Sequence, residues 1–281
     1  MRENLIRKGG QLVLIVGELI NTSRKAVKEA VAERNEAFIA DLARRQTDAG
    51  ANYLDVNCGT MLENEKDSME WLVQVVSNAV PTPLCIDSPD PEVIDAGLAL
   101  CKGRKTMINS TTLEKVRYGD IVPLARKYGS KLIALCIDDK GMPEHADDRV
   151  EIANALIRRL EEDGLGRDDI YIDPLVKPIS VDVTQGLSVL DAVSRIMKEN
   201  PGVHTICGLT NISFNLPERM QLNRTFMIQT MARGMDSYII DITNRQISGA
   251  LFASAALLGQ DRFCRKYIKS YRNGIFAENQ I

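Results

Sequence analysis

The chain of 281 residues lacks the features that mark membrane, secreted and nucleic-acid-binding proteins. No apolar run approaches the roughly 18 residues that a bilayer-spanning helix needs, and the segment Met1 to Gly10 is too polar for a secretory signal. The formal net charge of -3 leaves no excess of basic residues for a nucleic acid. We therefore expect a cytoplasmic protein that binds neither membranes nor nucleic acids.

Histidine is scarce, and the cysteines are not paired. The chain has two histidines and six cysteines, and no two cysteines stand in C-x-x-C spacing. Four of the six lie in or directly after short apolar runs, where a free cysteine behaves as a small apolar side chain. Cys58 is the exception to this structural explanation, because it follows the polar residue Asn57 at the end of a run, where a site residue could stand. Without paired cysteine and histidine ligands, no metal site is expected.

Eight short apolar runs, each ending in a polar residue, are the most informative pattern present. Helix-like stretches separate the runs, and parallel strands require such crossovers. The alternation predicts a single (β/α)8 TIM barrel over residues 12–260, with a short N-terminal extension and a helical C-terminal extension at 261–281. The polar residues that end the eight runs are Glu18, Asp55 with Asn57, Asp87, Asn109, Asp138, Asp173, Asn211 and Asp241.

Helical segments recur between the runs. The segment 247–258 is apolar on all sides, so it must be buried on more than one side. A second subunit would cover it in a homodimer, and the alternative is that residues 261–271 of the same chain do so. The predicted helices span 24–49, 66–79, 91–101, 113–128, 148–163, 184–199, 223–233 and 245–258.

The strand ends define the candidate site, because the active site of such a barrel lies at its C-terminal face. Taken singly, Asp55, Asp138 or Asp241 is more often a helix cap or a structural hydrogen bonder than a ligand contact. Four other residues lie on four separate strands at one level, where buried polar groups need partners. They are candidates to bind a flat, nitrogen-rich heterocycle such as a pterin: Asp87, Asn109, Asp173 and Asn211.

These residues stand in motifs that resemble those of the pterin-binding methyltransferases, which act on methyltetrahydrofolate and a corrinoid protein. The resemblance runs in order from residue 12 to residue 270, so it is specific although each short motif alone is weak. The motifs are 17–21 (GELIN), 54–59 (LDVNCG), 69–73 (MEWLV), 85–88 (CIDS), 107–110 (MINS), 171–175 (YIDPL) and 208–213 (GLTNIS).

The resemblance implies a role for each strand-end residue. Asp173 would receive the N3–H and 2-amino donors of the pterin, and Asp87 and Asn109 would hold its other edge. Asn211 would reach N5, the nitrogen that carries the methyl group, and Gly208 would let the ring approach the backbone. Phe214 departs from the pattern, since some relatives have a polar residue there. Further candidates around the same mouth are Glu18, Asp55, Asn57, Ser213, Arg219 and Asp241.

The implied activity is transfer of a methyl group between N5 of tetrahydrofolate and the cobalt of a corrinoid protein. Tetrahydrofolate or 5-methyltetrahydrofolate would be the substrate. Neither His145 nor His204 stands in the Asp-x-His-x-x-Gly pattern that ligates cobalt, so the corrinoid is expected on a separate, transiently docking protein. The methyl group would move to cobalt in acetogenic one-carbon metabolism and to tetrahydrofolate in a demethylation pathway, and we slightly favour tetrahydrofolate as the acceptor.

Other functions remain open at this stage. The chain would otherwise be a non-catalytic folate-binding component of a methyltransferase assembly. A dihydropteroate synthase should carry Ser-Arg-Lys near the seventh strand, but here 23–25 (SRK) follows the first. A barrel lyase or aldolase would need a reactive lysine, and only Lys177 stands just beyond a strand end. His204 opens the seventh run, so a structural role is expected, and His145 falls in a loop.

Overall fold

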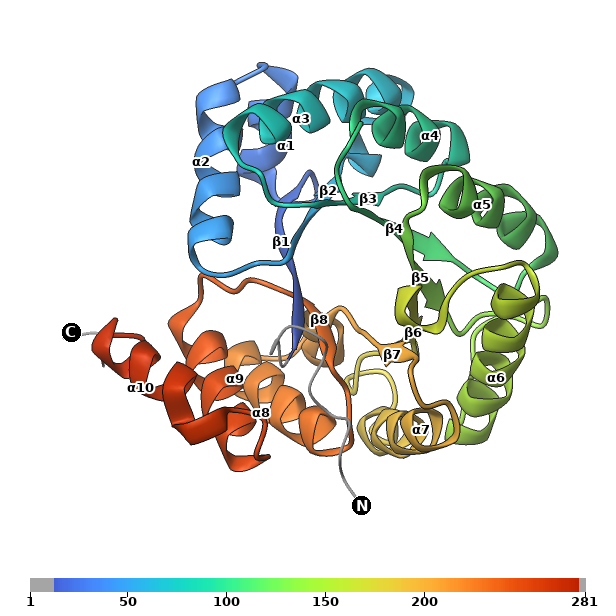
Figure 1. Cartoon of the computed structure of the whole chain (residues 1–281), viewed down its shortest axis with the longest axis vertical. Helices are drawn as coiled ribbons and strands as arrows, with labels where there is room; N and C mark the ends of the chain where they lie inside the picture. Colours follow the sequence, from blue (N-terminus) through green and yellow to red (C-terminus); the bar gives the residue numbers. More distant parts are fainter. Residues whose placement is uncertain (1–12, 278–281) are drawn as a thin grey trace.

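The computed structural model describes residues 13–277, which form a ring of eight parallel strands inside a ring of helices (Figure 1). The strand order around the sheet is β7-β6-β5-β4-β3-β2-β1-β8, so neighbours in sequence are neighbours in space. The predicted (β/α)8 barrel is confirmed. The strands are β1 Leu14–Asn21, β2 Tyr53–Asn57, β3 Leu84–Asp87, β4 Thr106–Thr111, β5 Lys131–Leu135, β6 Ile170–Asp173, β7 His204–Thr205 and β8 Ser237–Ile240.

The ring closes between β7 and β8 through a short contact. Gly208 forms an isolated bridge with Ile239, and the N–H of Ile239 donates to the carbonyl of Cys207 over 2.9 Å. The predicted continuation of the seventh apolar run as a strand to Asn211 is wrong, because β7 ends at Thr205 and the chain coils into the 3-10 helix η3 (Leu209–Ser213). Asn211 therefore lies on a helical turn beside the closing seam.

The helices pack outside the sheet, and most begin and end within three residues of the prediction. The single helix predicted over 24–49 is wrong, because Arg34 adopts a positive φ of 54° and breaks it into two helices. The Asn35 side chain then accepts from the N–H of Phe38 and starts the second helix. The helices are α1 Lys25–Ala32, α2 Glu36–Asp48, α3 Glu65–Ala79, α4 Pro91–Leu100, α5 Lys115–Tyr128, α6 Ala146–Glu162, α7 Gln185–Glu199, α8 Arg219–Ala232, α9 Arg245–Leu257 and α10 Arg265–Arg272.

An apolar layer fills the inside of the ring. Every strand or its direct continuation contributes at least one side chain to it, and this layer is separate from the larger clusters between strands and helices. Such packed layers make the interior of a small parallel barrel solid. The members are Leu14, Val16, Tyr53, Cys85, Met107, Ile133, Tyr171, Ile206 and the partly buried Ile239.

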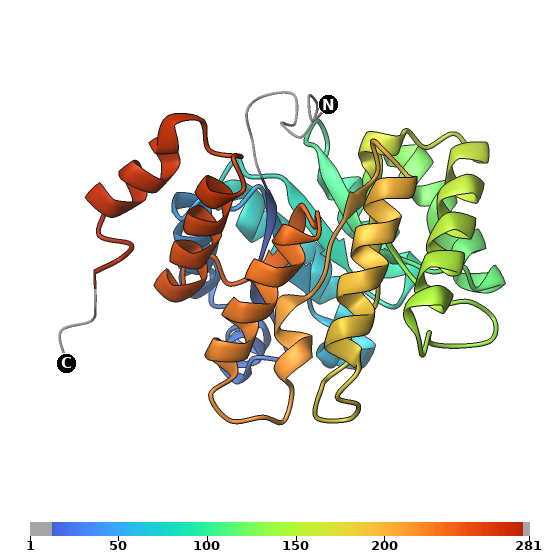
Figure 2. The same cartoon turned by 90° about the horizontal axis from the view of Figure 1, so that it is seen from below.

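The C-terminal extension covers part of α9, beside which α10 lies outside the ring (Figure 2). A Cβ atom on Gly249 would stand 3.3 Å from the ring of Phe276, so the extension packs closely there. The apolar surface of α9 is thus partly covered by the same chain, as the single-chain alternative predicts. Leu257 remains 88% exposed at the end of α9. No helix within residues 13–277 is long and apolar enough to cross a membrane.

Candidate active site

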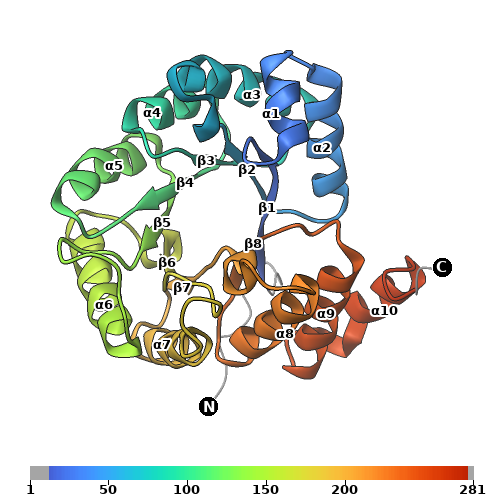
Figure 3. The same ribbon diagram turned by 180° about the vertical axis from the view of Figure 1, so that it is seen from behind.

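A layer of polar residues follows the apolar layer at the end of the barrel where the strands stop. Figure 3 shows the ring of strands and helices from the side opposite to that of Figure 1. Side chains alternate along a strand, so the residue two positions after an interior residue points to the same side, one level nearer the mouth. Applied to the apolar layer, this rule selects most of the candidates found in the sequence. The selected residues are Glu18, Asp55, Asp87, Asn109, Leu135, Asp173, Gly208 and Asp241.

Three adjacent strands bring amide and carboxyl groups to one level. Asn57 of β2 is in register with Asp87 of β3, which is in register with Asn109 of β4. The Asn109 side-chain amide donates to Asp55 Oδ1 over 3.4 Å. Burial raises the pKa of Asp55 well above its ordinary value, and the neighbouring carboxylate of Asp87 raises it further.

Asp87 closes one wall of the mouth. Burial raises its pKa to about 6, while a hydrogen bond from Asn57 and the positive charge of Arg117 oppose the shift. Arg117 also donates to the backbone carbonyls of Ser88 and Ser110, which directly follow Asp87 and Asn109. An open pocket of about 360 Å³ lies against these residues and Leu135.

Asp173 is the last residue of β6 and is buried at the opposite wall. It is in register with Leu135 of β5. Its Oδ1 atom accepts from the N–H of Leu175 over 2.8 Å. Burial raises the pKa of Asp173 to about 7, and the Leu175 N–H and the nearby charge of Arg149 oppose that shift. A carboxyl group that titrates near neutral pH is common at functional sites.

Glu18 and Asp241 lie at the first and last strands. Burial raises the pKa of Glu18 to about 6, although Arg24 forms an ion pair with it at 2.8 Å. The carboxylate of Asp241 accepts from the N–H and hydroxyl of Thr243, so it shapes the turn that follows β8. Arg24, which follows the first strand in the sequence, therefore lies at the mouth, where it pairs with Glu18.

The η3 turn carries Asn211 and is braced from below. Asn211 is exposed, and its Nδ2 atom would lie 3.3 Å from a Cβ at Gly208, so the amide occupies the space that the glycine leaves. Ser213 is buried, donates to Asn223 Oδ1 over 2.7 Å and accepts from Arg219 Nε. Arg219 also donates to the carbonyl of Thr210 over 2.7 Å. These contacts hold the η3 turn in place, and Asn211 is its exposed residue.

Several residues considered from the sequence lie away from this layer. The fifth strand was predicted to run into Asp138, but β5 ends at Leu135, and Asp138 forms a small bridge with Gly141. Lys177 donates to the carbonyl of Pro143 over 2.7 Å and ties two loops together. Cys58 is buried, and burial raises its pKa to about 12. His145 is exposed at the start of α6.

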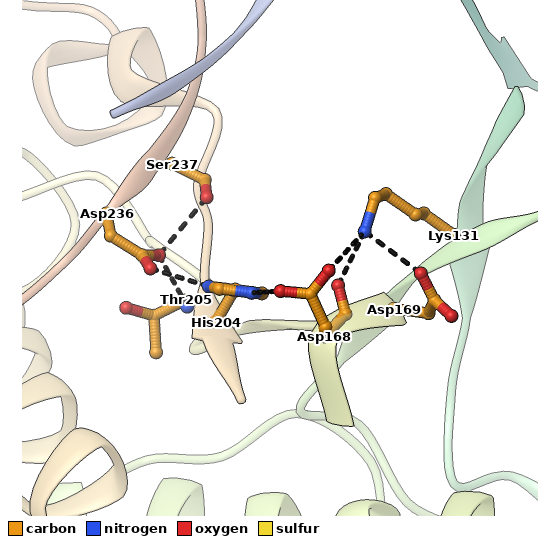
Figure 4. A network of polar contacts seen from close by, with 7 residues as sticks. All are labelled: Lys131, Asp168, Asp169, His204, Thr205, Asp236 and Ser237. Atoms are coloured by element: carbon orange, nitrogen blue, oxygen red, sulfur yellow. Dashed lines mark hydrogen bonds and ion pairs between the residues drawn. The ribbon is translucent and has the colours of Figure 1, made fainter. Parts of the chain in front are cut away.

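His204 lies at the opposite end of the barrel, as expected. Its ring contacts Asp236 at 2.6 Å and Asp168 at 3.2 Å, in a network that continues to Lys131 and Asp169 (Figure 4). The ring also stacks on Tyr171 with centroids 4.8 Å apart. Charged networks and packing at this end of a barrel contribute to stability, since the active site lies at the other end. His204 is therefore separated from the mouth by the apolar layer.

Two arginines near the site were missed in the sequence. Arg117 and Arg149 lie on α5 and α6, where arginine is ordinary for an amphipathic helix and carries no motif. Arg149 is fully buried although it stands in the first turn of its helix. Its position after Asp147 and Asp148 resembles a solvated charge cluster, so the sequence held no usable signal. Within residues 13–277, no group of three or more His, Cys, Asp or Glu side chains is arranged to hold a metal ion.

Comparison with known proteins gives matches along nearly the whole chain. A family described as pterin binding enzymes matches residues 17–241. A methylcorrinoid:tetrahydrofolate methyltransferase of Eubacterium limosum is 40% identical over 264 residues, which are 93% of this chain and 97% of that protein. A methionine synthase of Mycobacterium leprae is 30% identical over 241 residues, which are 81% of this chain and 20% of that protein.

Solved structures with the same fold include dihydropteroate synthases. That of Xanthomonas albilineans with 4-aminobenzoic acid has a TM-score of 0.66 and 19% identity, and the match covers 88% of this chain and 92% of that one. That of Thermus thermophilus has a TM-score of 0.62 and 19% identity, with 87% and 94% covered. At this identity, the likeness concerns the fold.

Proposed function

We propose that this chain, which belongs to the family of pterin-binding enzymes, is a methyltransferase that moves a methyl group between N5 of tetrahydrofolate and the cobalt of a corrinoid protein. The observation that carries the proposal is the 40% identity to a methylcorrinoid:tetrahydrofolate methyltransferase over almost the full length of both chains. The barrel mouth supports it, because carboxyl and amide groups gather there on neighbouring strands.

The pterin would lie across the polar layer. We assign its 2-amino and N3–H donors to the carboxylate of Asp173, which is buried and has one oxygen already held by Leu175. Asp87 and Asn109 stand in register on adjacent strands and would hold the other edge of the ring. Hydrogen bonds from a neutral ligand to a carboxylate are stronger than those between neutral groups, so Asp173 would contribute most to affinity.

Asn211 is the residue that we assign to N5. When tetrahydrofolate is the acceptor, the N5 lone pair forms the new bond to the methyl carbon, and the cobalt–carbon bond breaks with both electrons left on cobalt. N5 loses its proton in this direction and gains one in the reverse. An amide can accept from N5–H or donate to a nitrogen that gains electron density, so it assists both directions by positioning and charge stabilisation.

The proton that N5 exchanges needs a carrier. Burial raises the pKa of Glu18 to about 6, so this carboxyl group titrates near neutral pH. A group whose pKa lies near the working pH exchanges protons most effectively. Glu18 is therefore our candidate for the proton carrier, and no histidine is required.

The cobalt would be brought to the mouth by a corrinoid protein. Apolar side chains stand exposed on the segments that follow the strands, so they surround the mouth and offer a docking surface. Leu187 is 74% exposed at the start of α7, and Phe214 is 53% exposed after η3. Exposed apolar groups of this kind mark interaction sites. The docking rim comprises Leu62, Val116, Met142, Val181, Val183, Leu187 and Phe214.

The activity is tested by mixing the purified chain with methylcobalamin and tetrahydrofolate and following the corrinoid absorbance. We expect demethylation of the cobalamin with formation of one 5-methyltetrahydrofolate per methyl group lost. A chain that binds tetrahydrofolate but transfers nothing from any methylcobalamin or methylated corrinoid protein would instead be a non-catalytic folate-binding component.

Docking and chemistry can be separated. Leu187→Asp should slow transfer from a methylated corrinoid protein while leaving transfer from free methylcobalamin unchanged, because only the protein carrier contacts the rim. Leu100→Asp, at a partly exposed leucine that ends α4 away from the mouth, is the matched control. Equal slowing with both methyl donors would argue against a docking role for Leu187.

We further propose a homodimer and a demethylation pathway. Leu257 and nearby Phe263 and Tyr271 stay exposed at the C-terminal extension, which would place the dimer contact there. Leu257→Asp should then yield a monomer in sedimentation. The direction rests on the name of the Eubacterium limosum relative, and loss of the gene should block growth of its host on methylated donors while other growth continues.

A further inference from the structure

Arg149 is a buried cation with no direct carboxylate partner among residues 13–277. Its side chain is fully buried, and every acceptor of its hydrogen bonds is a neutral group. Burial of a guanidinium destabilises the fold unless hydrogen-bond acceptors replace the lost water, and neutral acceptors do so here. The acceptors are the backbone carbonyls of Glu144, His145, Pro174 and Leu175 and the side chains of Gln185 and Ser188.

These acceptors come from the loop before α6, the turn after β6 and the first residues of α7. Nε donates to the carbonyl of Pro174 over 2.8 Å and Nη2 to that of Leu175 over 3.2 Å. Nη1 donates to the Ser188 hydroxyl over 2.9 Å, at the start of α7. The hydrogen bonds of this one guanidinium thus connect α6 to α7 and to the turn that follows β6.

The turn that Arg149 holds is conformationally unfavourable by itself. Leu175 has a positive φ of 60°, a region that residues other than glycine seldom adopt. Such a conformation persists only where surrounding contacts fix it. The N–H of the same residue donates to Asp173 Oδ1 over 2.8 Å, so the turn in turn fixes the carboxylate.

We propose that Arg149 is a positioning residue of the pterin site, which holds the turn at residues 173–175 so that Asp173 presents its second oxygen to the ligand. This inference rests on the proposed function, because Asp173 receives the pterin there. The cation acts on Asp173 through the turn and through its charge, without touching the ligand.

The charge of Arg149 also bears on the ionisation of Asp173. It opposes the upward shift that burial imposes on the pKa of that carboxyl group. The other ionisable groups around the pair are the buried thiols Cys136 and Cys207, and Asp148 and Asp182 near the arginine. Removal of the guanidinium should therefore raise the pKa of Asp173 and move the pH dependence of pterin binding to higher pH.

The test compares Arg149→Met and Arg149→Lys with the unchanged chain, with tetrahydrofolate binding measured by calorimetry from pH 5.5 to 8.5. Arg149→Met should weaken binding at pH 7 about fivefold if the pKa of Asp173 rises by one unit from about 7, because the ionised fraction then falls from about one half to about one tenth. The midpoint of the pH dependence of tetrahydrofolate binding should lie at higher pH in Arg149→Met. In Arg149→Lys the midpoint should stay unchanged and only the affinity should fall. Arg158→Met, at an exposed arginine of the same helix, is the matched control and should change neither.

Folding is checked by circular dichroism and thermal unfolding. Should Arg149→Met fail to fold, Ser188→Ala decides, because it removes one acceptor and leaves the arginine in place. It should weaken binding about threefold with little change in melting temperature. Folded variants with unchanged affinity and midpoint would overturn the inference.

If the unchanged chain binds no tetrahydrofolate, the proposed function fails. If it binds, and Asp173→Asn weakens binding while the Arg149 variants do not, only the positioning role fails.

Discussion

Replacement of Asp173 by asparagine gives the sharpest test of the pterin site, because the two side chains have the same shape. Oδ1 is held by the N–H of Leu175, so the asparagine should keep its oxygen there and turn its NH2 group toward the ligand. A donor would then face the donors of the pterin. The charge is lost, and the ligand donors in this buried site lose their acceptor.

The size of the effect follows from these changes. A hydrogen bond to a charged group contributes about 1.5 to 3 kcal/mol, and an unsatisfied buried donor costs about 1 to 3 kcal/mol. Because the pKa of Asp173 is about 7, the free carboxyl group must be ionised before it binds, which costs about 0.4 kcal/mol at pH 7. A net loss of about 2 to 3 kcal/mol corresponds to roughly 30- to 150-fold weaker binding.

The pH dependence provides a second readout. Since the bound carboxylate must be ionised, binding to the unchanged chain should release protons below pH 7 and strengthen as the pH rises toward 8. Titration calorimetry in buffers of different ionisation enthalpy measures that release. The proton release near pH 7 should vanish in Asp173→Asn, while effects of Asp87 near pH 6 remain. Equal affinity and equal proton release in both proteins would remove Asp173 from the site.

Four further outcomes are expected. Asn211→Ala should lower the single-turnover rate of methyl transfer more than it weakens tetrahydrofolate binding, and a variant with weak binding but full rate would make Asn211 a binding residue only. The purified chain should show no cobalamin absorbance, and transfer should require added cobalamin or corrinoid protein. His204→Gln should lower the free energy of unfolding by about 1 to 3 kcal/mol in urea titration and leave transfer unchanged. Because the pKa of Asp173 is raised in the folded chain, the protonated carboxyl group makes a contribution to stability that is present below about pH 4 and is lost as the pH rises through 7. Asp173→Asn should therefore raise the melting temperature relative to the unchanged chain, and the increase should be larger at pH 8 than at pH 5.

The strand-end residues could be predicted because a barrel imposes a strict alternation. An interior residue such as Tyr171 is followed two positions later by Asp173, and the same step leads from Cys85 to Asp87. Hydrophobic runs with a polar residue at the same offset record that alternation directly in the sequence. The barrel and the level of its polar residues could therefore be predicted from the sequence.

Backbone conformations outside regular elements were not accessible. Arg34 and Leu175 adopt positive φ angles that their residue types do not announce, so the break before α2 and the turn after β6 were not predicted. The Asn35 cap was a usable signal for the break. Arg149 illustrates the other limit, since its burial depends on two loops that meet it only in the folded chain.

The narrow seam between β7 and β8 bears on the motions of the native state. Because few backbone hydrogen bonds join these strands, opening there requires less free energy than opening elsewhere in the sheet. The Ile239 amide should therefore exchange its hydrogen with solvent sooner than the central strand amides. Asn211 lies on the turn that follows this seam. The opening that exposes the Ile239 backbone amide should therefore also let the Asn211 side chain move with N5. Slower hydrogen exchange at the Ile239 amide in the presence of tetrahydrofolate would show that the bound ligand keeps the barrel closed at this seam.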